Sequence, residues 1–266
     1  MPFRVIRIFI SIYYKAMTYE GTRNSDGKRE GPGKMTYSNG DIYEGNWHND
    51  KRHGPGKMTY SAGGSYVGGF KEGKMSGTGK MEYANGELYY GDFKDSAREG
   101  SGIHIWPSGG VYKGAWMGDA RNGKGAMTDD SQNRYMGTWV NGLKHGVFDL
   151  YIPSENGTCK GRYANDQTSG DWNCSYNNLD GEIWYYLGQM ENAKRNGVGT
   201  MITHDGREFS GTWTNNALLT GSPTSPRSHT RSGSSQRRTS RSRGGRRNRH
   251  TKKRYKGTRT CYNVKR

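Results

Sequence analysis

Histidines are the first side chains to inspect for acid–base or metal chemistry. Five of the seven lie before residue 221, at His48, His53, His104, His145 and His204. None has a serine, aspartate or cysteine partner at a spacing typical of a catalytic triad or a metal site, and no phosphate-binding loop is present. The sequence therefore predicts no catalytic residue, no metal site, no cofactor and no small-molecule substrate.

The three cysteines are the next candidates. Cys159, Cys174 and Cys261 form an odd number, and none belongs to a Cys-x-x-Cys pair or has a histidine at a zinc-ligand interval. We expect free thiols in a reducing compartment, with Cys159 and Cys174 packed in a protein core.

Basic residues recur at one position of the sequence, two residues before a glycine. This candidate anion-binding column consists of Arg29, Arg52, Arg98, Arg121, Lys144 and Arg195. On neighbouring structural units about 10 Å apart, these cations would form a track for anionic lipid head groups or an acidic protein surface. The alternative is a row of charged turn residues that maintains solubility and protects sheet edges.

The C-terminal segment is a second candidate site for polyanions. Residues 221–266 hold 16 of the 41 lysine and arginine residues and no aspartate or glutamate, which leaves 25 basic and 24 acidic residues before them. We expect this segment to be disordered and to bind polyanions in a salt-sensitive manner. The candidate residues are Arg237, Arg238, Arg241, Arg243, Arg246, Arg247, Arg249, Lys252, Lys253, Arg254 and Lys256.

The elements that position these residues follow from composition and periodicity. The chain has 42 glycines in 266 residues, 12% aromatic residues and a mean hydropathy of −1.08, which favours short strands and tight turns over a deep core. An aromatic residue, or one cysteine in its place, recurs every 23 to 27 residues. We define a unit as the segment that begins at each of Tyr19, Tyr43, Tyr66, Tyr89, Tyr112, Tyr135, Cys159, Tyr186 and Phe209.

Each unit begins with an aromatic–x–Gly–x–aromatic pattern. Alternate residues of a strand share one face, so each unit presents two rings separated by a glycine gap. The expected core residues are Tyr43, Trp47, Tyr66, Phe70, Tyr89, Phe93, Tyr112, Trp116, Tyr135, Trp139, Tyr186 and Trp213. A polar turn, a Gly-x-Gly and a second alternating strand follow, and turns such as Asn39-Gly40 close the unit.

A hairpin of this kind cannot bury its aromatic face alone, whereas stacked hairpins can. The sequence therefore predicts an all-β fold: an elongated, single-layer, twisted ribbon of stacked β-hairpins, followed by a disordered tail. We place an N-terminal extension at 1–18, about eight repeats at 19–217, and the basic Arg/Ser-rich tail at 218–266. Residues 5–14 alternate like an extra capping strand; the alternative is an upstream start that precedes a true first residue at Met17.

The segments YEGNW and HGPG within residues 43–56 closely resemble the MORN repeat. The resemblance covers about residues 19–215 and implies a non-enzymatic module for protein interaction, oligomerisation or membrane apposition. Three departures stand out: Arg23 replaces the second aromatic residue of the first unit, and Val147-Phe148 and Asp171-Trp172 replace the second Gly of two Gly-x-Gly motifs.

Two hypotheses for function follow. In the first, a non-enzymatic scaffold holds protein partners or self-associates through its repeat face, while the tail tethers it to a polyanion. In the second, nucleic-acid binding by residues 221–266 is the main activity, or the basic column tethers the protein to an anionic membrane. The sequence has no apolar segment of the roughly 20 residues that a membrane span needs. We expect an intracellular protein, cytoplasmic or membrane-peripheral, with nuclear import through the tail as an alternative.

Overall fold

A computed structural model of the protein describes residues 16–224, and all but a short turn of its regular structure is β-strand. The first strands are β1 (Thr18–Arg23), β2 (Arg29–Thr36), β3 (Ile42–His48), β4 (Lys51–Thr59), β5 (Gly64–Lys71), β6 (Lys74–Tyr83), β7 (Leu88–Lys94), β8 (Ala97–Ile105) and β9 (Val111–Met117). The others are β10 (Ala120–Thr128), β11 (Arg134–Val140), β12 (Leu143–Ile152), β13 (Gly157–Ala164), β14 (Gln167–Asn177), β15 (Ile183–Glu191), β16 (Lys194–Ile202), β17 (Glu208–Thr214) and β18 (Ala217–Thr224).

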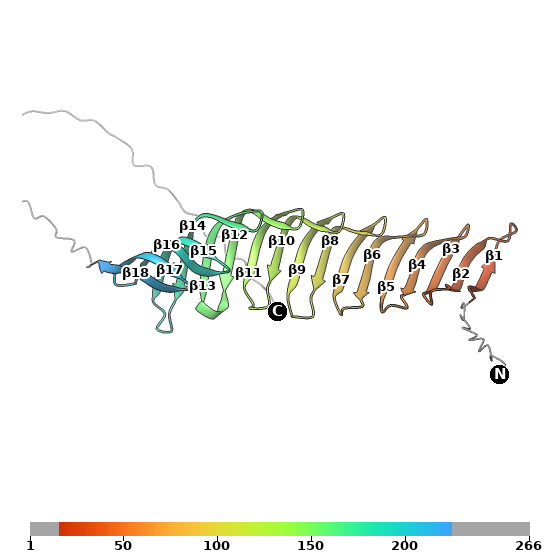
Figure 1. The fold of residues 1–266 in the computed structure, drawn as a ribbon. Coiled ribbons are helices and arrows are strands. Elements are labelled where there is room, and N and C mark those ends of the chain that lie inside the picture. The colour runs from red at the N-terminus through yellow and green to blue at the C-terminus, as the bar shows by residue number, and fades with distance from the viewer. Residues whose placement is uncertain (1–15, 225–266) are drawn as a thin grey trace, which may run out of the picture. The chain divides into compact units, whose positions relative to one another are not determined.

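These strands form one antiparallel sheet in which each strand pairs with the strands before and after it along the chain. β1 and β18 are therefore the two edges of an open, single-layer sheet. In Figure 1 the strands from β1 to β10 stand side by side, and those from β13 onward are turned about the long direction of the sheet. The predicted ribbon of stacked hairpins is confirmed.

Two-residue turns close most hairpins, and their backbone explains the polar sequence between strands. Asn49 and Asp50 have φ values of 47° and 66°, and Asp95 and Ser96 have 51° and 70°. Two consecutive positive φ values define the type I′ turn, whose twist matches that of antiparallel strands and which asparagine, aspartate and glycine tolerate best. Each unit is thus a tight hairpin, and a longer loop leads to the next.

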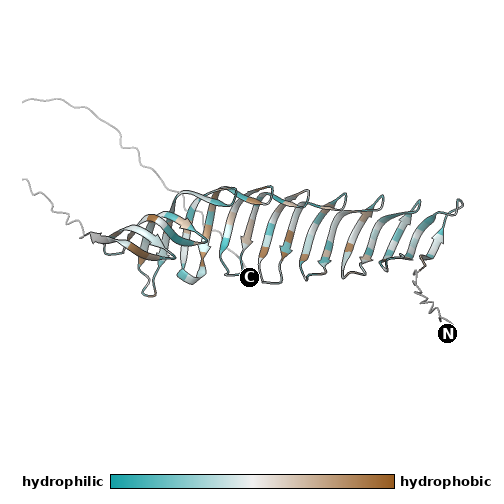
Figure 2. Cartoon of the chain, in the orientation of Figure 1, coloured by the Kyte–Doolittle hydropathy of each residue, from teal (hydrophilic) through white to brown (hydrophobic). Residues whose placement is uncertain are grey.

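The two faces of the sheet differ in sequence. One face, here called the aromatic face, carries a row in which Tyr43, Met58, Tyr66, Met81 and Tyr89 oppose one another on successive strands. The buried apolar residues form one cluster along this face. In Figure 2 apolar and hydrophilic segments recur from strand to strand along the sheet, as the repeat requires.

The described sheet differs from the predicted boundaries at its C-terminal end. β18 continues to Thr224, past the predicted start of the tail at residue 218, because Gly221 pairs with Gly211 and extends the row of facing glycines by one more strand. The tail residues from Arg237 to Lys256, Cys261 and the alternating segment 5–14 lie outside the described residues.

Candidate functional site

The aromatic face is built from one repeated contact between a tyrosine and two glycines. Tyr43 lies over Gly45 on its own strand and over Gly56 on the paired strand; a Cβ atom at either glycine would lie 2.5 Å from the Tyr43 hydroxyl oxygen. The Tyr43 hydroxyl donates a hydrogen bond to the carbonyl oxygen of Asn46 at 2.9 Å. The glycine pair therefore leaves the space in which the ring lies flat against the sheet.

Burial of these tyrosine side chains makes their hydroxyl groups less acidic. Burial raises the pKa of Tyr43, Tyr66, Tyr112 and Tyr186 to about 12. A nearby arginine partly offsets this rise at Tyr43, Tyr112 and Tyr186. The phenols stay protonated at neutral pH and act as hydrogen-bond donors to the backbone.

Rings from successive units interlock edge to face. The Tyr43 ring lies 5.1 Å from the Trp47 ring of its own unit and 5.0 Å from Phe70 of the next, with interplanar angles of 89° and 81°. Edge-to-face pairs at this separation favour the ring quadrupoles. The same geometry links Tyr66 with Phe70 and Phe93. All twelve predicted core residues are buried, each with 7% or less of its surface exposed.

The basic column covers these rings from above. The Arg98 guanidinium carbon lies 4.3 Å from the Trp116 ring centroid and 5.7 Å from that of Tyr89. Its Nε donates to Asp119 Oδ1 at 3.0 Å, and its Nη2 donates to the Asp119 carbonyl oxygen at 2.8 Å. Asp119 belongs to the hairpin turn of the next unit, so one side chain joins two units while it covers the rings between them.

The other members of the column vary this scheme. Arg29 binds Asp50 as Arg98 binds Asp119, and the Lys144 ammonium lies 3.9 Å from the Asp166 carboxylate. Arg52 and Arg121 instead donate to turn carbonyl oxygens of the next unit, at Gly73 (2.5 Å) and Gly142 (2.6 Å). Burial lowers the pKa of Arg121 and Lys144. The side chains of Arg29, Arg98, Lys144 and Arg195 are largely covered, with 13% to 22% of their surface exposed.

We call this layer the cation roof: Arg29, Arg52, Arg98, Arg121, Lys144 and Arg195 over the aromatic face. Met75 and Thr168 take the equivalent positions of the third and seventh units, where each faces the second aromatic residue of its unit. The structure thus brings all six predicted column residues onto one face and gives each a ring or turn partner inside the sheet. The turn residues Asp119 and Asp166 were not singled out from the sequence, although each lies 21 or 22 residues after its partner.

In units six and seven, the ring that lies over the glycine comes from the second strand of the hairpin and not from the first. Phe148, which stands where other units have the second glycine, lies over Gly137, and Trp172 lies over Gly161. Tyr135 leaves the glycine position free and donates its hydroxyl hydrogen to Asp129 Oδ2 at 3.0 Å. The lost glycines are therefore compensated by rings from the second strand of each hairpin.

In the regular units, tyrosine and methionine alternate along one row of the aromatic face. His104 takes the place of a methionine in this row, and only 4% of its surface is exposed. Arg98 Nη1 lies 2.8 Å from its Nδ1, and Glu87 Oε2 lies 2.9 Å from its Nε2. Because Arg98 can only donate, Nδ1 accepts and Nε2 carries the hydrogen. Burial lowers the pKa of His104, opposed by the hydrogen bond to Glu87. The imidazole is a neutral link between the roof and the sheet.

The expectation of free thiols is wrong for two of the three cysteines. Cys159 and Cys174 face each other on β13 and β14, 4.0 Å apart at Cα, and form a disulfide bond. The same 15-residue spacing separates directly opposed residues in other units, such as Tyr43 and Met58. A cysteine at both positions of one hairpin therefore meets its partner in register.

Two negative findings apply to residues 16–224. Within that range no group of histidine, cysteine, aspartate and glutamate side chains could hold a metal ion. The same range has no helix of the length and apolar character needed to cross a membrane.

Comparison with known proteins assigns the family. The MORN repeat model matches residues 25–42, 43–65, 66–87, 89–111, 112–134, 135–147 and 186–206, more than half of the chain. The chain therefore belongs to the MORN repeat family, whose repeats are generally non-enzymatic interaction modules. The predicted family membership is confirmed. No curated protein sequence matches the chain.

Among solved structures, the chain is similar to the TCP domain of Drosophila melanogaster SAS-4 (dCPAP), solved with a proline-rich motif of Ana2 (dSTIL). That match has 13% identity and a TM-score of 0.38, and covers 71% of this chain and 99% of that chain. The TCP10 domain of Danio rerio CPAP matches with 11% identity and a TM-score of 0.30, over 77% of this chain and 92% of that chain.

Proposed function

We propose that this MORN-repeat protein is a scaffold that holds protein partners against the uncovered face of its sheet. One observation carries the proposal. On the face opposite the aromatic face, Val67, Lys80, Tyr90, Ile103, Lys113, Ala126 and Met136 form one continuous row across β5 to β11. We call this row the outer-face strip.

The outer-face strip has the character of an interaction surface. Val67, Tyr90 and Met136 are 48%, 40% and 53% exposed, although each is large and apolar. The roof arginines close the aromatic face, whereas no second layer of the described residues covers the strip. Lys80 and Lys113 separate the apolar side chains of the strip, and tyrosine and methionine side chains are enriched in protein-binding surfaces.

A matched set of surface variants tests this role. In the full-length protein, Val67→Glu, Tyr90→Glu and Met136→Glu should together abolish salt-resistant self-association or partner capture, measured by sedimentation velocity and by cross-linking to purified partners. Because all three side chains face solvent, melting should change little. The matched control replaces Glu20 and Glu44 on the same face with lysine. Unchanged association of the triple glutamate variant would contradict a binding role for the strip.

We further infer that the basic tail tethers this scaffold to a polyanion, and the composition of residues 221–266 favours nucleic acid. Arg-Ser dipeptides and Arg243-Gly244-Gly245-Arg246 are typical of RNA-binding segments, whereas an anionic membrane is the alternative ligand. The contacts of the cation roof support a structural role for the column, so we assign polyanion binding to the tail alone.

Binding of the full-length protein to single-stranded RNA, duplex DNA and anionic liposomes across a salt series tests the tail. A full-length variant with glutamine at all 16 basic positions of 221–266 is the control. We expect tight RNA binding with a steep salt dependence in the wild type and a loss of both in the variant. Retained liposome binding by the variant would instead assign a lipid surface to the repeats.

A further inference from the structure

The cation roof ends before the last unit, and this end is the starting point for a new site. In four regular pairings a roof cation faces the second aromatic residue of its own unit, as Arg52 faces Trp47 and Arg121 faces Trp116. In the last unit Leu218 takes the cation's place and faces Trp213. An apolar side chain therefore replaces the guanidinium that would otherwise lie over the rings.

Arg195, the last member of the cation roof, is displaced toward Glu155. Arg195 Nη1 lies 3.3 Å from the carboxylate of Glu155, which belongs to the short 3-10 turn Pro153–Glu155 between β12 and β13. Its guanidinium lies 5.0 Å from the Tyr176 ring and 5.4 Å from Trp213. Arg52, in contrast, lies over the first aromatic residue of its own unit, Tyr43. Arg195 thus keeps the contact with the next unit at Trp213, as Arg52 does with Phe70, but leans toward Tyr176 of the seventh unit instead of lying over Tyr186 of its own unit.

Trp184 adds a wall that the other units lack. It stands two residues before Tyr186, the first residue of the eighth unit, where the sequence before other units has residues such as Asp41, Gly64, Glu87 and Gly110. It pairs with Tyr176 across the sheet and keeps 36% of its surface exposed. Trp184 therefore adds a partly exposed aromatic side chain beside the aromatic face.

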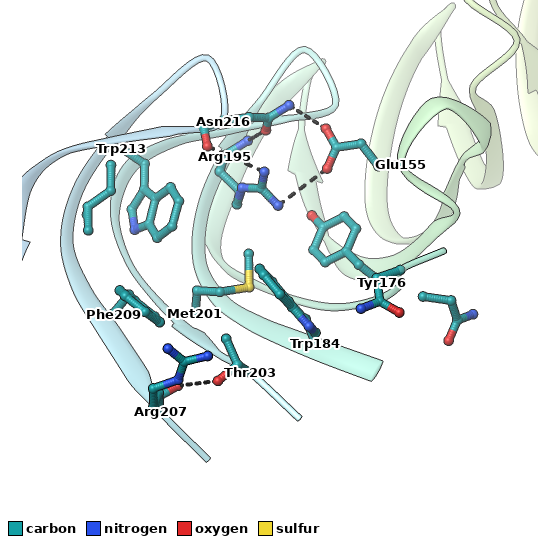
Figure 3. A pocket seen from close by; sticks show the side chains of 13 residues that line it. Glu155, Tyr176, Trp184, Arg195, Met201, Thr203, Arg207, Phe209, Trp213 and Asn216 are labelled. Carbon is teal, nitrogen blue, oxygen red and sulfur yellow. Dashed lines mark hydrogen bonds and ion pairs between the residues drawn. The ribbon is translucent and has the colours of Figure 1, made fainter. Parts of the chain in front are cut away.

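Together these three changes open a cavity of about 690 Å³, which we call the C-terminal pocket. Figure 3 shows Met201 between Phe209 on one side and Trp184 on the other, with the Arg195–Glu155 pair at one end and Arg207 at the other. The walls are mostly aromatic and apolar. Arg195 pairs with Glu155, and Arg207 pairs with Asp205 through Nε, so the Nη groups of Arg207 are the donors that suit a negative charge beside an apolar guest.

We propose that the C-terminal pocket binds a bulky apolar side chain of a partner polypeptide, with an acidic residue next to it in sequence paired with Arg207. The apolar side chain contacts Trp184, Phe209 and Met201. Arg207 is suited to the acidic neighbour because its side chain is 51% exposed and is held in place by Asp205 at 2.8 Å. This inference rests on the proposed scaffold function and names the partner's chemistry at one site.

Methionine methyl NMR of the full-length protein is a direct test. Met201 lines the pocket, whereas Met58 occupies the same row beneath Arg52 and serves as an internal control. The probes are the peptides acetyl-Gly-Trp-Glu-Gly-amide, its Trp-to-Ala analogue and its Glu-to-Lys analogue. We expect the first to shift the Met201 methyl and not Met58, the alanine analogue to shift neither, and the lysine analogue to bind about tenfold more weakly.

Variants that copy other units separate binding from folding. Leu218→Arg restores the residue found at this position in five other units and should close the pocket. Trp184→Asp removes a wall and installs the residue that stands two positions before Tyr43. Both should abolish the Met201 shift while melting stays near the wild type. Leu219→Arg, at a neighbouring residue 63% exposed, should leave the shift intact.

Three results would overturn the proposal: no peptide-induced shift of Met201, an undiminished shift in Leu218→Arg, or stronger binding of uridine monophosphate than of the tryptophan peptide. Each leaves the scaffold function standing if the outer-face variants still abolish association. If the outer-face variants associate like the wild type and the peptide still shifts the Met201 methyl, the scaffold proposal fails and the pocket proposal stands.

Discussion

Tyr43 donates its phenolic hydrogen to the carbonyl oxygen of Asn46, three residues along the same strand. The bond holds the ring flat against the sheet, over two glycines, instead of upright as in most strands. Tyr66, Tyr89, Tyr112 and Tyr186 make the same bond, at 3.0, 3.1, 3.1 and 2.8 Å. A single-layer sheet can thus bury large rings without a second layer.

The first prediction concerns the glycine beneath the ring. Gly56→Ala should lower the free energy of unfolding by about 2 kcal/mol or more, because the new Cβ would overlap the Tyr43 ring. In a Tyr43→Leu background the same substitution should cost much less, since the overlapping ring is gone. Urea unfolding of the four proteins of this cycle measures the coupling. Additive effects would show that the ring and the glycine do not depend on each other.

The second prediction concerns the cation roof. Arg98→Met should lower the free energy of unfolding by about 1–2 kcal/mol, because it removes a cation–π contact and the bonds to Asp119. Methionine is a fair replacement, since Met75 occupies the same position in the third unit. Lys113→Met on the outer face is the control and should change stability by less than about 0.5 kcal/mol. Equal effects at the two sites, measured by urea unfolding, would contradict a structural role for the roof.

The third prediction concerns pH. Because burial lowers the pKa of His104 below its usual 6.5, the unfolded chain binds this proton more readily than the folded protein. The contribution of His104 to stability is therefore present above about pH 6.5 and is lost as the pH falls below that value. Arg98 and Glu87 bond the ring, Arg121 lies near it, and Tyr83, Trp106 and Trp116 stack on it.

His104→Met provides the comparison for that pH dependence, since methionine stands at this position in the third unit. Thermal melting between pH 5 and 8 should show a smaller loss of stability at low pH in the variant than in the wild type. Parallel pH curves for the two proteins would refute the assignment.

The fourth prediction concerns the buried disulfide. Reduction of the Cys159–Cys174 bond should lower the free energy of unfolding by roughly 3 kcal/mol, the value expected for a loop of this length. Cys159→Ala with Cys174→Ala should melt identically with and without reductant. Mass spectrometry after alkylation in denaturant should find two more reactive thiols per chain in the reduced protein. No gain in thiols on reduction would mean that the pair is not bonded in solution.

The sequence was sufficient for the hairpins, because period-two alternation and the glycine turns are local signals. The cation roof was harder to predict: Arg98 and Asp119 are 21 residues apart, and their contact depends on the register between units. The disulfide was missed for a related reason, since Cys159 and Cys174 were assigned to repeat positions singly. The C-terminal pocket depends on the contact between Arg195 and Glu155, which belong to different units and meet only in the folded sheet.

At Phe148 and Trp172 the buried ring comes from the second strand of the hairpin, whereas in the earlier units it comes from the first. Segments of the chain before this change can therefore be exchanged for one another, and segments that include it cannot. Insertion or excision of one 23-residue segment between Tyr43 and Tyr135 leaves every ring above the glycines it needs, and changes the length of the array by about 10 Å. The same operation across Phe148 or Trp172 would place two rings in one gap or none. Whole repeats in the first half of the protein can therefore be duplicated or lost in evolution, which changes the length of the sheet. The second half does not allow such changes.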